Sequence, residues 1–220
     1  MCAGDTLVAM YGSAARGDAD ASSDLDILVL ADPGSNVLPS AIPSGAHPSR
    51  YSWAEWLKMR NEGSIFLQHI AAESRVLSHS GNGLWRFRAS VLNLPAYANA
   101  HRDVEAFTAA IDSIQNELNE PDCCLYFELS NIGMVVRHIS ILVCYLTGEV
   151  NFSRVASVRI AAQATGVARG LAEDFNSLYE FRLAFQHRAP MPIDVPSVRQ
   201  IRTWLEQAKE LLRSAEELIT

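Results

Sequence analysis

Two aspartates near the N-terminus have the residue type and the spacing of a metal site. Asp24 and Asp26 are separated by one residue and lead into the apolar residues 27–30. Because side chains alternate across a β-strand, both carboxylates are expected on the same side. Two such carboxylates repel each other unless a cation lies between them, and Mg²⁺ favours carboxylate oxygens together with phosphate. The pair therefore predicts a Mg²⁺ site that also receives a phosphorylated ligand.

A turn of small residues lies upstream of the two aspartates. Gly12 and Ser13 follow the apolar residues 6–11, which read as a strand. They offer backbone N–H groups and a hydroxyl without a bulky side chain, which suits a triphosphate. We expect the turn to hold the β- and γ-phosphates while the metal pair holds the reacting α-phosphate.

The order of these features resembles the signature of the DNA polymerase β-like nucleotidyltransferase superfamily, in the form of its small, minimal members. The sequence runs from a strand through Gly-Ser and Arg-Gly to Ser-Asp-Leu-Asp and a second strand. The resemblance implies that NTP is the co-substrate and that Mg²⁺ acts at a two-ion site. It implies catalytic metal ligands at Asp24 and Asp26. It implies nucleotide-binding residues at Gly12, Ser13, Arg16 and Ser23. The plainer alternative is a strand, a polar loop and a capped second strand.

One feature of the superfamily is not found in the sequence. Its third catalytic carboxylate normally lies on a later strand, which corresponds here to residues 46–52, and no acid occurs there. Asp32 and Glu55 are the nearest substitutes. The gap predicts that transferase activity is weak or absent, whereas nucleotide binding is less affected.

The pattern of apolar residues predicts an α+β fold. We expect an α/β domain at residues 1–95, which the resemblance implies is polymerase β-like, followed by an all-helical bundle at residues 96–220. Strands are predicted at 6–11 and 25–30, with a surface loop over 31–52 that includes a short strand near 50–52. Helices are predicted from residue 53, and over 64–77, 101–118, 122–147, 152–165, 171–188 and from 197 onward.

One predicted helix contains a second pair of polar residues. His69 and Glu73 are four residues apart within 64–77, a segment similar to a helix common in bacterial minimal nucleotidyltransferases. Catalysis is one reading of the pair. An ordinary pair on a half-buried helix face is the favoured one, because such pairs are common.

The helical half carries an Arg-x4-His motif at Arg182 and His187. With the long apolar helix before it, the motif resembles the HEPN (higher eukaryotes and prokaryotes nucleotide-binding) domain, which implies a metal-independent RNase site shared across a dimer. A five-residue step along one helix turns by roughly 140°, so a second subunit or a kink must close such a site. The alternative for His187 is a cation at a helix end. Glu128 and Asn131 look like the start of the helix that faces the active site in similar fused proteins.

Composition limits the remaining options. The net charge of −7 argues against a protein that coats nucleic acid or anionic membranes through its overall field. The four cysteines lack metal-type spacing, and no signal peptide or membrane-spanning stretch is recognised. We therefore expect a cytoplasmic protein with no membrane partner.

Two functions remain open at this stage. The first is transfer of a nucleoside monophosphate to an RNA end, a protein side chain or a small molecule. The second is nucleotide-dependent regulation in a toxin–antitoxin or defence system, through a HEPN-type RNase or interaction domain. A homodimer or a partner chain is an expected partner in either case.

Overall fold

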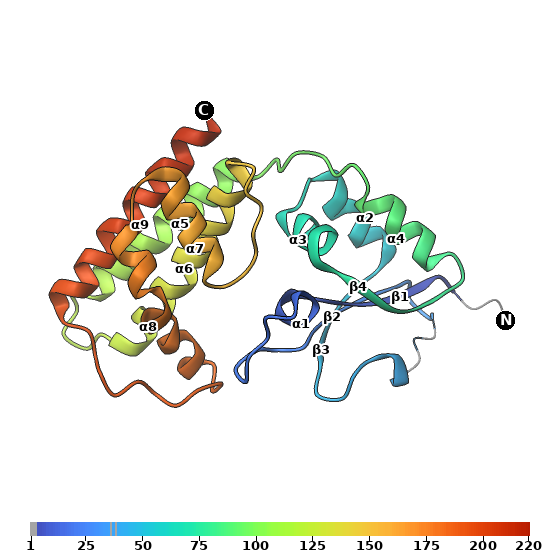
Figure 1. The fold of residues 1–220 in the computed structure, drawn as a ribbon, viewed down its shortest axis with the longest axis horizontal. Helices are drawn as coiled ribbons and strands as arrows, with labels where there is room; N and C mark the ends of the chain where they lie inside the picture. The colour runs from blue at the N-terminus through green and yellow to red at the C-terminus, as the bar shows by residue number, and fades with distance from the viewer. Residues whose placement is uncertain (1–3, 36, 38) are drawn as a thin grey trace. The chain divides into compact units, whose positions relative to one another are not determined.

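The computed structural model describes residues 4–35, 37 and 39–220. They group into two compact units, an N-terminal unit at Met1–Asn99 and a helical unit at Ala100–Thr220 (Figure 1). A mixed sheet with helices is thus followed by an all-helical region, which confirms the predicted α+β class. Of the four cysteines, Cys2 lies outside the described residues.

The N-terminal unit is built on a four-stranded sheet in the order β3-β2-β1-β4. The strands are β1 (Thr6–Tyr11), β2 (Asp26–Ala31), β3 (His47–Tyr51) and β4 (Arg75–Ser80). Strand β1 is antiparallel to both β2 and β4, whereas β2 and β3 are parallel. The two predicted strands are confirmed, and in the register the last residue of β1, Tyr11, lies opposite the first residue of β2, Asp26.

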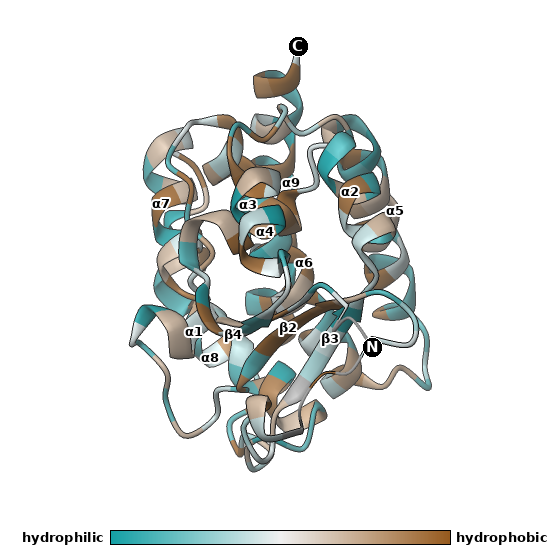
Figure 2. Cartoon of the chain, turned by 90° about the vertical axis from the view of Figure 1, so that its right-hand side faces the viewer, coloured by the Kyte–Doolittle hydropathy of each residue, from teal (hydrophilic) through white to brown (hydrophobic). Residues whose placement is uncertain are grey.

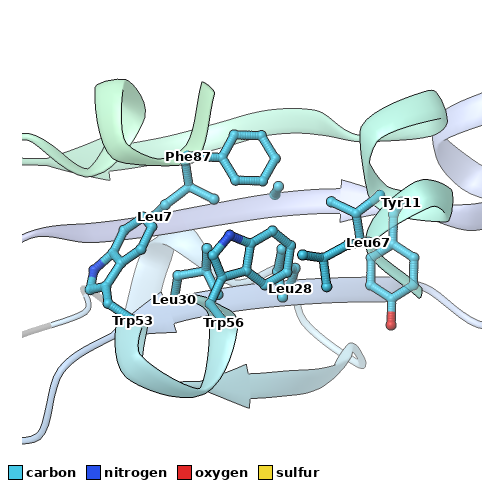
Figure 3. Packing of buried hydrophobic residues seen from close by; sticks show 10 residues of the cluster. Leu7, Tyr11, Leu28, Leu30, Trp53, Trp56, Leu67 and Phe87 are labelled. Carbon is cyan, nitrogen blue, oxygen red and sulfur yellow. The ribbon is translucent and has the colours of Figure 1, made fainter. Parts of the chain in front are cut away.

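Both faces of β1 and β2 are covered, which explains why β2 is a nearly continuous apolar run (Figure 2). The helices of this unit are α1 (Gly12–Arg16), α2 (Trp53–Asn61), α3 (Ile65–Glu73) and α4 (Gly83–Val91), with a short 3₁₀ turn at Pro39–Ala41. Trp56 from α2, Leu67 from α3 and Phe87 from α4 pack on one face of the sheet (Figure 3). Val8, Ile27 and Val29 face the other side, where loop residues cover them.

The helix predicted over 64–77 is wrong at its C-terminal end. Helix α3 ends at Glu73, Ser74 is extended, and β4 follows as an edge strand paired with β1. Leu77, the last residue of the predicted helix, lies on this strand with 44% of its surface exposed. Pairing with β1 outweighs the local helical periodicity, because strand formation depends on neighbours that are distant in sequence.

The helical unit contains α5 (Ala100–Glu117), α6 (Leu125–Leu146), α7 (Ala156–Thr165), α8 (Arg169–Phe185) and α9 (Val198–Ile219). Helix α6 packs against the other four, so it is the centre of the bundle as predicted. Contrary to the sequence expectation, α6 is long and apolar enough to span a membrane by length and composition alone. Its packing inside the bundle accounts for the same composition. Ser197 caps α9 by accepting the Gln200 N–H, which confirms the predicted helix start.

Candidate functional site

The strand register brings the predicted turn and the predicted metal ligand together. Gly12 follows β1 directly and has a φ of +71°, in the left-handed region that favours glycine. A Cβ atom at Gly12 would lie 2.6 Å from Oδ2 of Asp26, which is closer than Cβ atoms in proteins come to other heavy atoms. The Asp26 carboxylate therefore lies against the Gly12 backbone, and a larger residue at position 12 would force that carboxylate to move.

The second predicted metal ligand lies just outside the strand. Asp24 is exposed and precedes β2 by two residues, whereas Asp26 is half-buried. Strand alternation was the reason to expect both carboxylates on the same side, and it applies only from Asp26 onward. Asp24 belongs to the loop that leads into the strand. Both residues sit at the end of β2 that pairs with Tyr11.

The other two carboxylates in this loop, Asp20 and Asp18, have structural partners. Oδ1 of Asp20 accepts the Ser22 N–H at 2.8 Å and hydrogen bonds from the Ser22 and Ser23 hydroxyls. This is a local turn built by an aspartate side chain. The Ser23 hydroxyl, predicted to bind nucleotide, is a member of that turn, and Asp18 is the partner of Arg16.

Arg16 lies in an ion-pair network that joins α1 to α3. Its Nη1 donates to Oε2 of Glu73 at 2.5 Å, and its Nε contacts Asp18 at 3.1 Å. The same Glu73 oxygen lies 2.8 Å from Nε2 of His69, so the predicted i,i+4 pair exists and has a third member. Only 9% of the Glu73 side chain is exposed, compared with 22% for Arg16.

Tyr11 completes the surroundings of Asp26, and sequence reasoning missed its role. Its ring packs edge-on against His69 at 5.5 Å and Phe66 at 5.7 Å, and its hydroxyl is 3.3 Å from the Ser49 hydroxyl. Burial raises the pKa of Tyr11, and the Asp26 carboxylate acts in the same direction. The phenol is therefore neutral at physiological pH. Its position immediately before Gly12 was the only sequence signal that could have marked it.

The third carboxylate is also missing from the strand where it was expected. Strand β3 lies parallel to β2, with the His47 backbone in register with Asp26, and its sequence His-Pro-Ser-Arg-Tyr contains no acid. Among the described residues, no group of three or more histidine, cysteine, aspartate or glutamate side chains is arranged to hold a metal ion.

Neither substitute from the sequence can fill the gap. Asp32 follows the opposite end of β2, and a strand of that length separates it from Asp26 by roughly 20 Å. Asp32 accepts the Trp53 N–H at 3.2 Å. Glu55 accepts hydrogen bonds from the N–H and hydroxyl of Ser52 in the capping box of α2. Both carboxylates therefore serve structural contacts away from the aspartate pair.

The residues present fit a Mg²⁺ ion that arrives with a nucleotide. Mg²⁺ is commonly held by one or two carboxylates, and substrate phosphates supply further ligands. Asp26 and the exposed Asp24 provide the carboxylates, and the first of them lies beside the backbone of the predicted phosphate turn. A second ion, as predicted from the resemblance, would need a further carboxylate that β3 does not supply.

In the helical unit, the predicted residues have separate partners. Glu128 is buried in the first turn of α6, where the Asn131 amide lies 3.4 Å from its Oε2. Burial raises the pKa of Glu128, and the Glu117 carboxylate acts in the same direction. Arg182 is half-buried near the end of α8, and its Nη1 lies 3.4 Å from the Ser130 hydroxyl.

The expectation that Arg182 and His187 share one helix is wrong. Helix α8 ends at Phe185, and His187 is an exposed residue beyond it with a φ of +58°. Its N–H donates to the Ala184 carbonyl while the Arg188 N–H donates to the Leu183 carbonyl, both at 2.9 Å. These two bonds form a Schellman motif, in which the left-handed residue is usually glycine. His187 thus has a structural role in ending α8.

Comparison with known families bears on the N-terminal unit. Residues 3–76 match the family model described as "Nucleotidyltransferase domain". The matched segment includes β1 through α3 and ends inside β4, so it contains Gly12, Asp24, Asp26 and Glu73. Helices α5 to α9 lie outside it. No curated protein matches the chain.

Proposed function

Because residues 3–76 form a nucleotidyltransferase domain of the polymerase β-like kind, with a helical region after it, we propose that the chain transfers a nucleoside monophosphate from an NTP to a hydroxyl acceptor. The observation that carries this proposal is the Asp26 carboxylate lying against the bare backbone of Gly12. A phosphate turn and a metal ligand must be neighbours for such a reaction, and strand pairing makes these two neighbours.

Each residue of the site has a role in this proposal. Asp24 and Asp26 hold Mg²⁺, which when bound polarises the phosphoryl group and offsets its charge. The backbone of Gly12 and the hydroxyl of Ser13 hold the distal phosphates. Tyr11, which is neutral and whose hydroxyl contacts that of Ser49, adds no further negative charge beside Asp26.

The acceptor is proposed to bind the helical unit. A hydroxyl on an RNA end, a protein side chain or a small molecule would serve the same chemistry, since each attacks the α-phosphate and pyrophosphate leaves. Glu128 is the candidate contact, because it is a buried carboxyl near the start of α6 whose pKa is raised by burial.

A second candidate function is favoured by the strand β3. Because β3 has no acid, nucleotide binding without fast transfer fits the site, as in a regulatory protein of a toxin–antitoxin or defence system. The HEPN-type RNase form of this candidate needs His187 as a catalytic group. The structural role of His187 in the Schellman motif makes that form the weaker one.

Labelled nucleotides separate the two candidates. The chain is incubated with Mg²⁺ and each NTP labelled at the α-phosphate, with total RNA, with a protein extract or with an aminoglycoside. Transfer predicts slow labelling of one acceptor class, which is lost in the Asp24→Asn, Asp26→Asn double variant. If nucleotide binds but no label moves to any acceptor, the regulatory candidate replaces the transferase.

A further inference from the structure

Glu73 is a nearly enclosed charged group that contacts the helix carrying the proposed phosphate turn. Its side chain is 9% exposed, and one carboxylate oxygen contacts both Arg16 from α1 and His69 from its own helix. Arg16 is the last residue of α1, the five-residue helix that begins at Gly12. The Arg16–Glu73 pair therefore ties the end of that helix to α3, across 57 residues of sequence.

We propose that Glu73 is a positioning residue for nucleotide binding, and that Arg16 acts through this pair instead of binding phosphate itself. This inference rests on the proposed function, because it explains how the Gly12–Ser13 turn is held in place for nucleotide binding. The Arg16 guanidinium is already engaged by Asp18 at 3.1 Å and by Glu73 at 2.5 Å. Those two carboxylates already take the Nε donor and one Nη1 donor, so Arg16 would offer a phosphate fewer than its five N–H groups.

A chain of contacts leads from Glu73 to Asp26, the proposed metal ligand. His69 lies 2.8 Å from Glu73 and packs against the ring of Tyr11, which precedes Gly12. Gly12 in turn lies against the Asp26 carboxylate. Loss of the Glu73 charge thus frees α1 at its far end and removes a neighbour that orients His69.

The sign of the effect distinguishes positioning from direct binding. Glu73 is negatively charged and so is a triphosphate, so removing its charge should strengthen nucleotide binding by electrostatics alone. If Arg16 bound phosphate directly, Glu73 would compete for it, and the same removal would again strengthen binding. Only a positioning role predicts weaker binding when the charge is removed.

The test measures the Kd of Mg²⁺–ATP, –GTP, –CTP and –UTP by calorimetry for the native chain and for Glu73→Gln. Positioning predicts binding that is about tenfold weaker, as expected for loss of a charged hydrogen bond. The matched control is Glu55→Gln, the same change in the same unit, where glutamine preserves the capping box. Its Kd should equal that of the native chain.

Hydrogen exchange without nucleotide provides a second readout that is independent of activity. Glu73→Gln should exchange the amides of residues 12–18 faster than the native chain, while β1 is unchanged. Equal or tighter nucleotide binding, or unchanged exchange in residues 12–18, overturns the positioning role and leaves the proposed function standing. If the native chain binds none of the four nucleotides, the proposed function fails and this inference fails with it.

Discussion

The two units differ in how their candidate residues are brought together. In the N-terminal unit, Gly12 and Asp26 are distant in sequence, and the pairing of β1 with β2 places them in contact. In the helical unit, Arg182 and His187 are close in sequence, but the end of α8 separates their roles. A motif that spans two strands can be checked in the structure, because the fold must bring its parts together. A pair of residues at a fixed spacing in one helix occurs by chance in many unrelated sequences.

The largest expected effect concerns Gly12, with Gly17 as its matched control. Both have positive φ, but a Cβ at Gly17 meets nothing within 4 Å. Gly17→Ala should therefore lose only about 1–2 kcal/mol of unfolding free energy from backbone strain. Gly12→Ala carries the same strain and also displaces the Asp26 carboxylate, so it should weaken Mg²⁺–NTP binding at least tenfold, by about 1.4 kcal/mol or more.

Calorimetric titration of both variants checks this prediction, with urea unfolding to measure stability. Equal nucleotide affinity for Gly12→Ala and Gly17→Ala would show that the contact between Gly12 and Asp26 is irrelevant to binding.

A smaller effect is expected at His187, in the opposite direction. Because glycine suits the left-handed position better than histidine, His187→Gly should raise the free energy of unfolding by up to about 1 kcal/mol. It should leave Mg²⁺–NTP binding unchanged. Thermal unfolding of His187→Gly and His187→Ala measures the difference. A dimer that cuts RNA without Mg²⁺, and loses this activity in both variants, would restore the HEPN reading.

The smallest effects contrast two glutamates, one from each unit. Burial raises the pKa of Glu128 in the folded protein above its value in the unfolded chain. As the pH rises through these two pKa values, ionisation of Glu128 therefore lowers the free energy of unfolding. Glu128→Gln should therefore gain stability relative to the native chain above this window and none below it. Ser52 hydrogen bonds lower the pKa of Glu55, so its contribution is present at higher pH and lost as pH falls through its folded pKa.

Both trends are measured by urea unfolding of Glu128→Gln and Glu55→Gln between pH 3.5 and pH 8. This range includes the ordinary pKa of glutamate, about 4.3. The stability difference from the native chain should grow with pH for each variant, with opposite signs. The same sign for both would contradict the assigned environments.

Sequence patterns were sufficient for elements whose signal is local. Strand β1 and the run of β2 follow from apolar residues between turns, and the start of α9 follows from Ser197. Strand β4 was missed because Val76 and Leu77 are partly exposed on an edge, where pairing with β1 decides the structure. The local spacing of apolar residues had predicted that the helix continues to residue 77.

The same distinction holds within the candidate site. The order of the motif was sufficient to expect Gly12 beside Asp26, and the strand register brings them together, whereas the phosphate and metal roles of Gly12, Asp24 and Asp26 stay predictions. The Arg16–Glu73 pair and the contact between Tyr11 and Ser49 could not be predicted, since both join elements that only the tertiary fold brings together. The end of α8 before His187 could likewise not be predicted, because the left-handed position that ends it is occupied by histidine instead of the usual glycine.

The most direct test of the central claim is the thermal shift produced by Mg²⁺–NTP in the native chain and in the Asp24→Asn, Asp26→Asn double variant. A ligand that binds only the folded state raises the melting temperature, and at 100 times its Kd it adds about 2.7 kcal/mol of stability. The account predicts a shift in the native chain that requires Mg²⁺ and is lost in the double variant. An equal Mg²⁺-dependent shift in the double variant would contradict it.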